Sequence, residues 1–216
     1  MILFVGKNKP VVDSAAKALP QDSYKIISDS ISDDEINEAL MLQPDYLISF
    51  LSPYIFNAQQ LKAVKYAINF HPGLPKYPGI GCYSWAIYEG AREYGCTIHT
   101  MEPEVDAGKI LYVSSFTIDE HISVAWLIEK TYAYMLVLFY NFITDLDLYP
   151  KSRATYVYKH NEWGKKHTRK ELDNLMRIEP GMAADEIERR IRATSYKGWK
   201  PYIMLGGYRF KLNLEG

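Results

Sequence analysis

Short apolar runs alternate with amphipathic segments along the first part of the chain. The first run, MILFVG (1–6), predicts a buried strand, and KPVVDSAAKAL (9–19) predicts a helix, for which Pro10 suits the first turn. The next helix is predicted at 32–43, where the sequence starts with a capping box. Further strands are predicted at 24–29, 44–52, 63–70, 94–101 and 109–118. This alternation predicts an α/β fold with a mostly parallel sheet and helices on both faces.

The rest of the chain begins with a long apolar segment and continues, after Pro150, with shorter and more charged segments. The helix predicted from about Ser123 to Leu148 is apolar enough to cover one face of the sheet. After Pro150 the sequence predicts two short charged helices and a hairpin that turns at two glycines, over residues 167–178, 183–194 and 201–214. We therefore expect a sheet domain over residues 1–150 and a small α+β appendage over residues 151–216.

The composition narrows the classes of partner and compartment. The 216 residues are 48% apolar and 24% charged, and 25 basic against 26 acidic residues give a net charge of −1. This balance argues against nucleic acid or an anionic membrane as a partner. Glu129 and Lys130 interrupt the apolar helix and leave an uncharged stretch shorter than the roughly 18 residues of a membrane span. Two cysteines in no metal-ligand spacing fit a reducing cytoplasm, which is the compartment we expect.

The first strand and helix lack a phosphate-binding loop. The connecting segment VGKNKPVVDS has one glycine where a dinucleotide-binding fingerprint needs three, and it does not match a P-loop. The predicted sheet is Rossmann-like, but without that loop it is no evidence for NAD.

The strand end and loop INFHPGLPKYPG (68–79) hold the first candidate chemistry. Asn69 and His71 flank Phe70, so both side chains point to the same side of the strand, just before a loop rich in proline and glycine. Asp106 lies in a later turn before another strand, where its carboxylate is able to face a cleft between strand ends. An imidazole beside a carboxylate is a suitable base, and an amide stabilises an oxyanion. These three residue types suffice for acyl transfer to an amine.

Other interpretations of the same residues stay open from the pattern alone. A histidine at a strand end is more often a hydrogen-bonded structural residue, and Asp before Ala-Gly is often only a turn. His71, His99 and Asp106 also suit a divalent ion and a metal-dependent hydrolase, although no tight metal-binding spacing supports this. A module that binds its ligands without turnover is a third interpretation.

Two segments in a fixed order resemble the core of the 10-formyltetrahydrofolate-dependent formyltransferases. These are INFHPGLPKYPG (68–79) and YGCTIHTMEPEVDAGKIL (94–111), and the resemblance covers about residues 45–115. In that family an N-x-H element supplies Asn and His, and a V-D-x-G turn supplies Asp. The resemblance therefore implies 10-formyltetrahydrofolate as co-substrate, no metal, and three catalytic residues: Asn69, His71 and Asp106.

Differences within the family indicate which members the chain resembles most. VGKNKPVVDS does not resemble the Gly-Ser-Asn loop of glycinamide ribonucleotide transformylases, and the chain leaves no room for the basic C-terminal barrel of methionyl-tRNA formyltransferases. Tyr-Pro-Gly at 77–79 and IRATSYKGWKPY (191–202) look most like the nucleotide-sugar N-formyltransferases. The resemblance implies an amino-deoxy sugar on a nucleoside diphosphate as acceptor, such as a dTDP- or GDP-4-amino-4,6-dideoxyhexose for a surface polysaccharide like O-antigen. The other two types are the alternatives.

The resemblance also implies residues for two ligand sites. The segment ISFLSPYIF (48–56) is similar to the strand and loop that pack against the folate pterin. The residues implied for folate are Phe50, Leu51, Tyr54 and His99. Those implied for the sugar nucleotide are Lys76, Tyr77, Gly79 and Trp199. Packing of the hairpin is an equal explanation for Trp199. The apolar strands of the hairpin predict a homodimer through this region.

Overall fold

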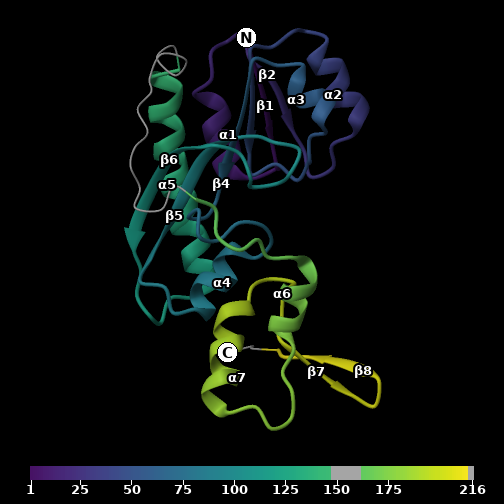
Figure 1. The fold of residues 1–216 in the computed structure, drawn as a ribbon, viewed down its shortest axis with the longest axis vertical. Helices are drawn as coiled ribbons and strands as arrows, with labels where there is room; N and C mark the ends of the chain where they lie inside the picture. The colour runs from purple at the N-terminus through teal and green to yellow at the C-terminus, as the bar shows by residue number, and fades with distance from the viewer. Residues whose placement is uncertain (147–161, 214–216) are drawn as a thin grey trace.

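A six-stranded sheet forms the centre of the molecule, and the computed structural model describes residues 1–146 and 162–213 (Figure 1). The strand order is β2-β1-β3-β4-β5-β6. The first four strands are parallel to one another, and β5 is antiparallel to both of its neighbours. The strands are β1 (Ile2–Gly6), β2 (Tyr24–Ile27), β3 (Tyr46–Phe50), β4 (Tyr66–His71), β5 (Glu93–Thr100) and β6 (Ile110–Thr117). The predicted α/β class with a mostly parallel sheet is confirmed.

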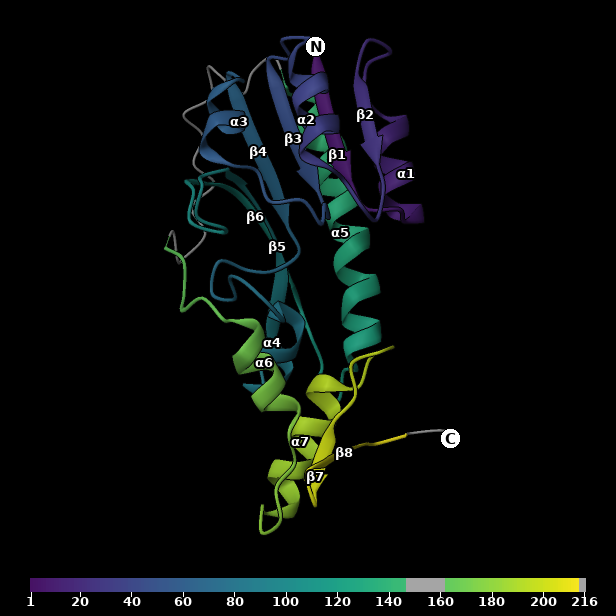
Figure 2. The same cartoon turned by 90° about the vertical axis from the view of Figure 1, so that its right-hand side faces the viewer.

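Helices cover both faces of this sheet, as the alternation of side chains along β1 requires (Figures 1 and 2). Phe4 packs in a core shared with α1 (Pro10–Lys17) and α5 (Val124–Thr144). Its neighbours Leu3 and Val5 face the opposite side, where they meet α2 (Asp33–Leu40). Because both faces are buried, β1 is apolar at every position. Within the described ranges, no helix has the length and apolar character needed to cross a bilayer.

Two short helices lie on either side of β4 in the sequence, one before the strand and one after the loop that follows it. Residues before β4 form α3 (Ala58–Lys62), which the sequence analysis did not predict. Asn57 accepts from the Gln60 backbone N–H, and the Gln60 side chain accepts from the Asn57 N–H, so a capping box starts this helix. After β4 the loop leads into α4 (Cys82–Tyr88). The connection from α4 to β5 is a short turn at Gly90, whose φ is 68°, and β5 pairs with β4 in the antiparallel direction.

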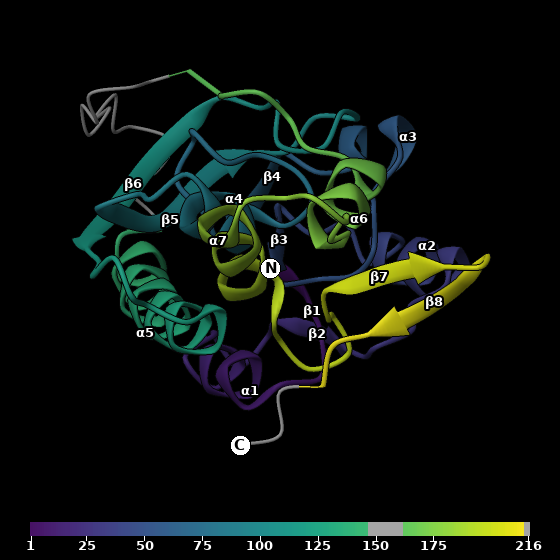
Figure 3. The ribbon, with the colours of Figure 1, turned by 90° about the horizontal axis from the view of Figure 1, so that it is seen from below.

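The C-terminal part lies at one end of the sheet and packs on α4 (Figures 1 and 3). It consists of α6 (Arg169–Met176), α7 (Ala184–Thr194) and the hairpin of β7 (Tyr202–Leu205) and β8 (Tyr208–Lys211). Ala193 of α7 belongs to the same buried cluster as Ala86 of α4 and Leu127 of α5. The predicted helices and hairpin are confirmed. The predicted domain boundary at Pro150 and the predicted helix end at Leu148 lie outside the described residues.

Candidate active site

Three neighbouring strands bring the candidate polar residues to one place in the sheet. Ser49 of β3 is in register with Asn69 of β4, and Asn69 is in register with His99 of β5. His71 is the last residue of β4, two positions after Asn69, so the two side chains lie on the same side as strand alternation predicts. The turn after β5 carries Asp106 back toward this row.

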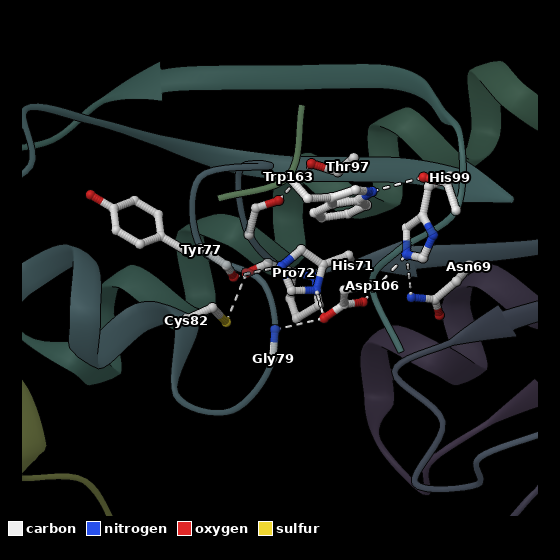
Figure 4. A network of polar contacts seen from close by, with 12 residues as sticks. Asn69, His71, Pro72, Tyr77, Gly79, Cys82, Thr97, His99, Asp106 and Trp163 are labelled. Carbon is white, nitrogen blue, oxygen red and sulfur yellow. Dashed lines mark hydrogen bonds and ion pairs between the residues drawn. The ribbon is translucent and has the colours of Figure 1, made fainter. Parts of the chain in front are cut away.

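The carboxylate of Asp106 bridges the two imidazoles (Figure 4). Its Oδ1 lies 3.4 Å from Nε2 of His99, and its Oδ2 lies 3.4 Å from Nδ1 of His71. The Gly79 N–H donates to Oδ2 at 2.8 Å. Asp106, His71 and His99 are only 6%, 4% and 2% exposed, so solvent screens these charges weakly. The structure thus joins the predicted pair of His71 and Asp106 with His99, for which the resemblance implied a cofactor contact.

Burial and charge set the protonation states of this cluster. Burial lowers the pKa of His71, and His99 adds to this, whereas Asp106 and the Tyr77 carbonyl act in the opposite direction. Burial alone would raise the pKa of the Asp106 carboxyl, but His71, His99 and the Gly79 N–H together hold it below its usual range. At neutral pH the arrangement therefore holds an ionised carboxylate beside a neutral His71, as a general base requires.

Hydrogen bonds to backbone carbonyls fix the tautomer of each ring. Nε2 of His71 lies 3.0 Å from the Tyr77 carbonyl oxygen, so Nε2–H donates there and the lone pair of the neutral ring is on Nδ1, facing Asp106. Nδ1 of His99 lies 2.8 Å from the Thr100 carbonyl oxygen, which leaves Nε2 of the neutral ring as acceptor. The Asn69 Nδ2–H donates to that atom at 3.0 Å. His99 thereby holds the orientation of the Asn69 amide.

A cleft opens beside this cluster on the side of β3 and of the turn after β5. The residues that line it are Ser49, Ser52, Tyr54, Ile55, Phe56, Leu61, Asn69, His99, Met101, Glu102, Glu104, Val105 and Asp106. His71 is not among them and lies behind two residues that are, Asp106 and His99. The arrangement offers an amide donor and a carboxylate in the cleft, with a basic nitrogen held behind the carboxylate. The arrangement suits acyl transfer, because the amide is able to stabilise an oxyanion and the basic nitrogen is able to accept a proton.

The geometry of the cluster does not favour a metal centre. Among residues 1–146 and 162–213, no group of His, Cys, Asp and Glu side chains is arranged to hold an ion. His71 and His99 face different oxygens of one carboxylate, so the three side chains do not converge on one point as metal ligands do. The alternative of a metal-dependent hydrolase therefore has no support in the arrangement of these three residues.

The sequence profile of the formyl transferase family matches residues 7–134, which contain the whole cluster. The chain belongs to the formyl transferase family. Its curated relatives include a methionyl-tRNA formyltransferase of Enterococcus faecalis, 32% identical over 131 residues, which are 58% of this chain and 42% of the relative. The bifunctional polymyxin resistance protein ArnA of Wigglesworthia glossinidia brevipalpis is 35% identical over 100 residues, or 45% of this chain and 15% of that protein. The chain thus spans less than half the length of these relatives.

Solved structures resemble this formyl transferase over its full length. A 4-N formyltransferase from Francisella tularensis has a TM-score of 0.80 at 21% identity, with 99% of this chain and 97% of that one covered. A sugar N-formyltransferase from Shewanella sp FDAARGOS_354 has a TM-score of 0.79 at 19% identity, with the same coverage. An N-formyltransferase from Helicobacter canadensis, solved with folinic acid and dTDP-3-aminofucose, has a TM-score of 0.71 at 18% identity, with 97% and 86% covered. At these identities the likeness is one of fold.

The residues implied for folate separate in this formyl transferase into two groups. Tyr54 and His99 line the cleft, whereas Phe50 and Leu51 do not. The Phe50 ring is fully buried on the opposite side of β3, in ring contact with Phe4, Phe70 and Phe139. Strand alternation explains the difference, because the neighbour Ser49 faces the cleft and Phe50 must then face the core. The ring of Phe50 is therefore not a wall of the cleft.

The residues implied for the sugar nucleotide are also distributed over two places. Lys76, Tyr77 and Gly79 lie in the loop after β4, where Lys76 pairs with Glu89 at 2.8 Å and the Tyr77 ring is buried. Gly79 has a φ of 82° and contributes its N–H to Asp106. Trp199 lies in the C-terminal part, in a turn closed by hydrogen bonds with Tyr196, and the Arg169 guanidinium lies 5.5 Å from its ring.

Trp163 borders the cluster and was not predicted by the sequence analysis. The Trp163 ring lies against both imidazoles, with ring centroids 5.7 Å from His71 and 4.8 Å from His99 (Figure 4). The local pattern around Trp163 is charged and irregular, so nothing in its own segment marks it as part of a site. Only its contacts with residues far away in the sequence reveal it.

Proposed function

We propose that the protein transfers the formyl group of 10-formyltetrahydrofolate to the amine of an amino-deoxy sugar linked to a nucleoside diphosphate. The observation that carries this proposal is the bridge of Asp106 between His71 and His99 beside the Asn69 amide, at the edge of a cleft. Membership of the formyl transferase family supports the transferred group. The sugar acceptor is supported by the full-length likeness to sugar N-formyltransferases, one of them solved with folinic acid and dTDP-3-aminofucose. A dTDP- or GDP-4-amino-4,6-dideoxyhexose is the proposed substrate type.

The proposed reaction assigns one task to each of three side chains. The neutral amine attacks the formyl carbon, and the Asn69 Nδ2–H that is not bound to His99 donates to the oxyanion that forms. The ammonium proton passes, through a water held by Asp106, to the lone pair on Nδ1 of His71. The carboxylate then balances the imidazolium charge. The bond from the formyl carbon to the folate nitrogen breaks, the proton returns to that nitrogen, and tetrahydrofolate and a formamido sugar leave.

An acceptor panel tests the proposal. The protein is incubated with 10-formyltetrahydrofolate and, separately, with dTDP- and GDP-linked amino sugars, glycinamide ribonucleotide and methionyl-tRNA. The expected result is a mass gain of about 28 Da, one CO unit, on an amino sugar only. Gain on methionyl-tRNA would instead favour the activity named for the partial sequence relatives. No gain on any acceptor, with ligand binding retained, would favour a binding module.

We further propose that the two ligands approach the cluster from different sides. Folate would occupy the cleft lined by Tyr54 and His99. The sugar nucleotide would lie along Lys76, Tyr77 and Gly79 and extend to Trp199. A second pocket, near Trp199, is lined by Ser195, Tyr196, Lys197, Lys200 and Leu212. Burial, and then the neighbouring Lys197 and Lys7, lower the pKa of Lys9, while Glu129 and Asp29 act in the opposite direction, so three ammonium groups influence one another near this pocket. Such a group of cations suits a diphosphate.

This arrangement predicts separable binding defects. Tyr54→Ala removes a cleft wall whose hydroxyl bonds to Asp33 and Gln60, and we expect weaker folate binding with normal nucleotide-sugar binding. For Trp199→Ala we expect weaker nucleotide-sugar binding with normal folate binding. Calorimetric titration of each variant with each ligand measures both effects, and Trp126→Ala, an exposed tryptophan at the start of α5, is the control. Normal nucleotide-sugar binding by Trp199→Ala would assign that ring to packing on Arg169 instead.

The hairpin is the proposed contact between two subunits. Ile203, Leu205, Tyr208 and Phe210 share one face, all of them apolar and exposed, and an isolated two-stranded hairpin is only marginally stable. A second copy of the same face would bury it. We expect Leu205→Asp to convert a dimer to a monomer in sedimentation velocity, whereas Met204→Asp, on the opposite face, should leave the dimer intact. A dimer that persists in Leu205→Asp, or a wild-type monomer, rejects this contact.

A further inference from the structure

A segment from the C-terminal part crosses the active-site loop. We call residues 163–168 the strap. The Gly164 N–H donates to the Pro75 carbonyl at 2.9 Å, and the His167 N–H donates to the Pro78 carbonyl at 3.2 Å. The His167 carbonyl in turn accepts from the Ile80 N–H at 2.9 Å. The strap is thus joined by backbone hydrogen bonds to the loop that follows His71.

Two glycines allow the strap and the loop to approach each other closely. A Cβ on Gly164 would lie 2.3 Å from the Lys76 carbonyl oxygen, and a Cβ on Gly79 would lie 2.5 Å from the His167 carbonyl oxygen. Both obstacles are backbone atoms, which cannot move aside as a flexible side chain can. The close contact therefore fixes where the strap places its first side chain, Trp163.

Trp163 connects the strap to both histidines of the proposed catalytic cluster and to the turn that carries Asp106. Its indole stands nearly perpendicular to both imidazoles, at 80° to His71 and 83° to His99 (Figure 4). Its Nε1–H donates at 2.7 Å to the carbonyl of Gly108, which is two residues after Asp106 in the same turn. A Cβ on Gly108 would lie 1.7 Å from the Thr100 carbonyl oxygen, so this turn is itself held against the end of β5.

We propose that Trp163 is a positioning residue for formyl transfer: it holds the Asp106 turn in place against His71 and His99 and keeps water away from the imidazoles on the side of the strap. This inference rests on the proposed function, because it takes His71 and Asp106 as the groups that move the proton. Trp163 does not line the cleft, so it acts through these residues and not on the substrates.

The surroundings of His71 make the effect of Trp163 measurable. The titratable groups that face this ring are Asp106 and His99, while the nearby Cys82 thiol stays neutral because burial raises its pKa to about 12. The charged groups of the strap are paired, Lys166 with Glu104 and Lys165 with Glu171, and its His167 stacks on Trp85 with a pKa that burial lowers. Loss of the indole therefore changes the hydration of His71 without removing a charge. Because burial is the main cause that lowers the pKa of His71, admitting water should raise it.

Two substitutions at this position separate the hydrogen bond from the ring. Trp163→Phe keeps an aromatic ring but loses the N–H that reaches Gly108, and Trp163→Ala removes both. We expect kcat to fall roughly tenfold in Trp163→Phe and up to roughly a hundredfold in Trp163→Ala, with KM for both substrates nearly unchanged, because small displacements of positioned groups have effects of this size. The acid limb of the pH profile of kcat should move to higher pH. Trp126→Phe is the matched control.

Imidazole NMR titration of the same variants gives a readout independent of turnover. The resonances of the two rings are assigned with His71→Asn and His99→Asn. The His71 resonance should titrate at higher pH in Trp163→Ala than in the wild type. In Trp126→Phe its titration should be that of the wild type. Wild-type kcat and wild-type titration in both Trp163 variants would overturn the inference. If Trp163→Ala does not fold, Trp163→Phe decides alone. A lower kcat at unchanged KM supports the inference, and a wild-type kcat rejects it. If His71→Asn retains turnover, the proposed function fails, and the titration still decides whether Trp163 positions the cluster.

Discussion

His71→Asn should lower kcat roughly 100- to 10,000-fold while the protein stays folded, because a positioned general base contributes about this much. Asparagine has no lone pair of comparable basicity to place where Nδ1 of His71 faces Asp106. Its amide reaches the position of Nδ1 beside Asp106 but not that of Nε2, so the single hydrogen bond to the Tyr77 carbonyl is lost while the other bonds of the loop after β4 stay. Steady-state kinetics with saturating folate and amino sugar measure the effect.

Two comparisons make this result specific to His71. His121→Asn, at an exposed histidine before α5, should retain wild-type kcat and circular dichroism. In the wild type, kcat should fall on acidification below a pH that lies under the ordinary imidazole value of 6.5, because burial lowers the pKa of His71 and the base must be neutral. Near-normal turnover in His71→Asn would remove His71 from the mechanism and leave the proton to Asp106 or His99.

Asp106→Asn should reduce kcat roughly 1,000- to 10,000-fold, since the amide preserves the shape but not the charge that balances the imidazolium. The amide oxygen still accepts from the Gly79 N–H, so the loop is expected to keep its place. Because Asp106 raises the pKa of His71, its loss should also move the remaining acid limb of the activity profile to lower pH. Kinetics over a pH series measure both changes, and wild-type turnover in this variant would contradict the assignment.

The same substitution has a defined effect on stability against pH. The folded-state pKa of Asp106 lies below its ordinary value of 3.8, so its charge stabilises the fold above about pH 4, and this contribution is lost as the pH falls through the folded-state pKa. Asp106→Asn lacks the contribution at every pH. Urea denaturation should therefore show a smaller loss of unfolding free energy between neutral and acidic pH in the variant than in the wild type.

Strand alternation predicted a large part of the site. It placed Asn69 and His71 on one side of β4, in agreement with the contacts that join both to His99 or Asp106, and the turn chemistry around Asp106 was enough to suspect a cleft. Alternation does not supply the register between strands, however. The pairing of Ser49 with Asn69 decides that Ser49 faces the cleft and Phe50 the core, and no local pattern contains that pairing.

The features that were missed depend on contacts between distant segments. Trp163 meets Gly108 and His71 only because the strap folds back over the loop, and the charged sequence around it gives no periodic signal. His99 was assigned to folate by resemblance, but its bond to Asn69 and its contact with Asp106 emerge from the register of β4 and β5. Among these missed features, only the helix α3 could have been predicted from its own sequence, by the capping box of Asn57 and Gln60.

A single-turnover experiment tests the central claim, that this cluster transfers a formyl group from folate to an amine. The protein is mixed with 10-formyltetrahydrofolate labelled with carbon-13 at the formyl carbon and with the nucleotide-linked amino sugar, and the label is followed by NMR. We predict a labelled formamide on the sugar, formed in step with tetrahydrofolate, and no such transfer by His71→Asn. Label recovered as free formate in the presence of the amine, or equal transfer by His71→Asn, would contradict the account.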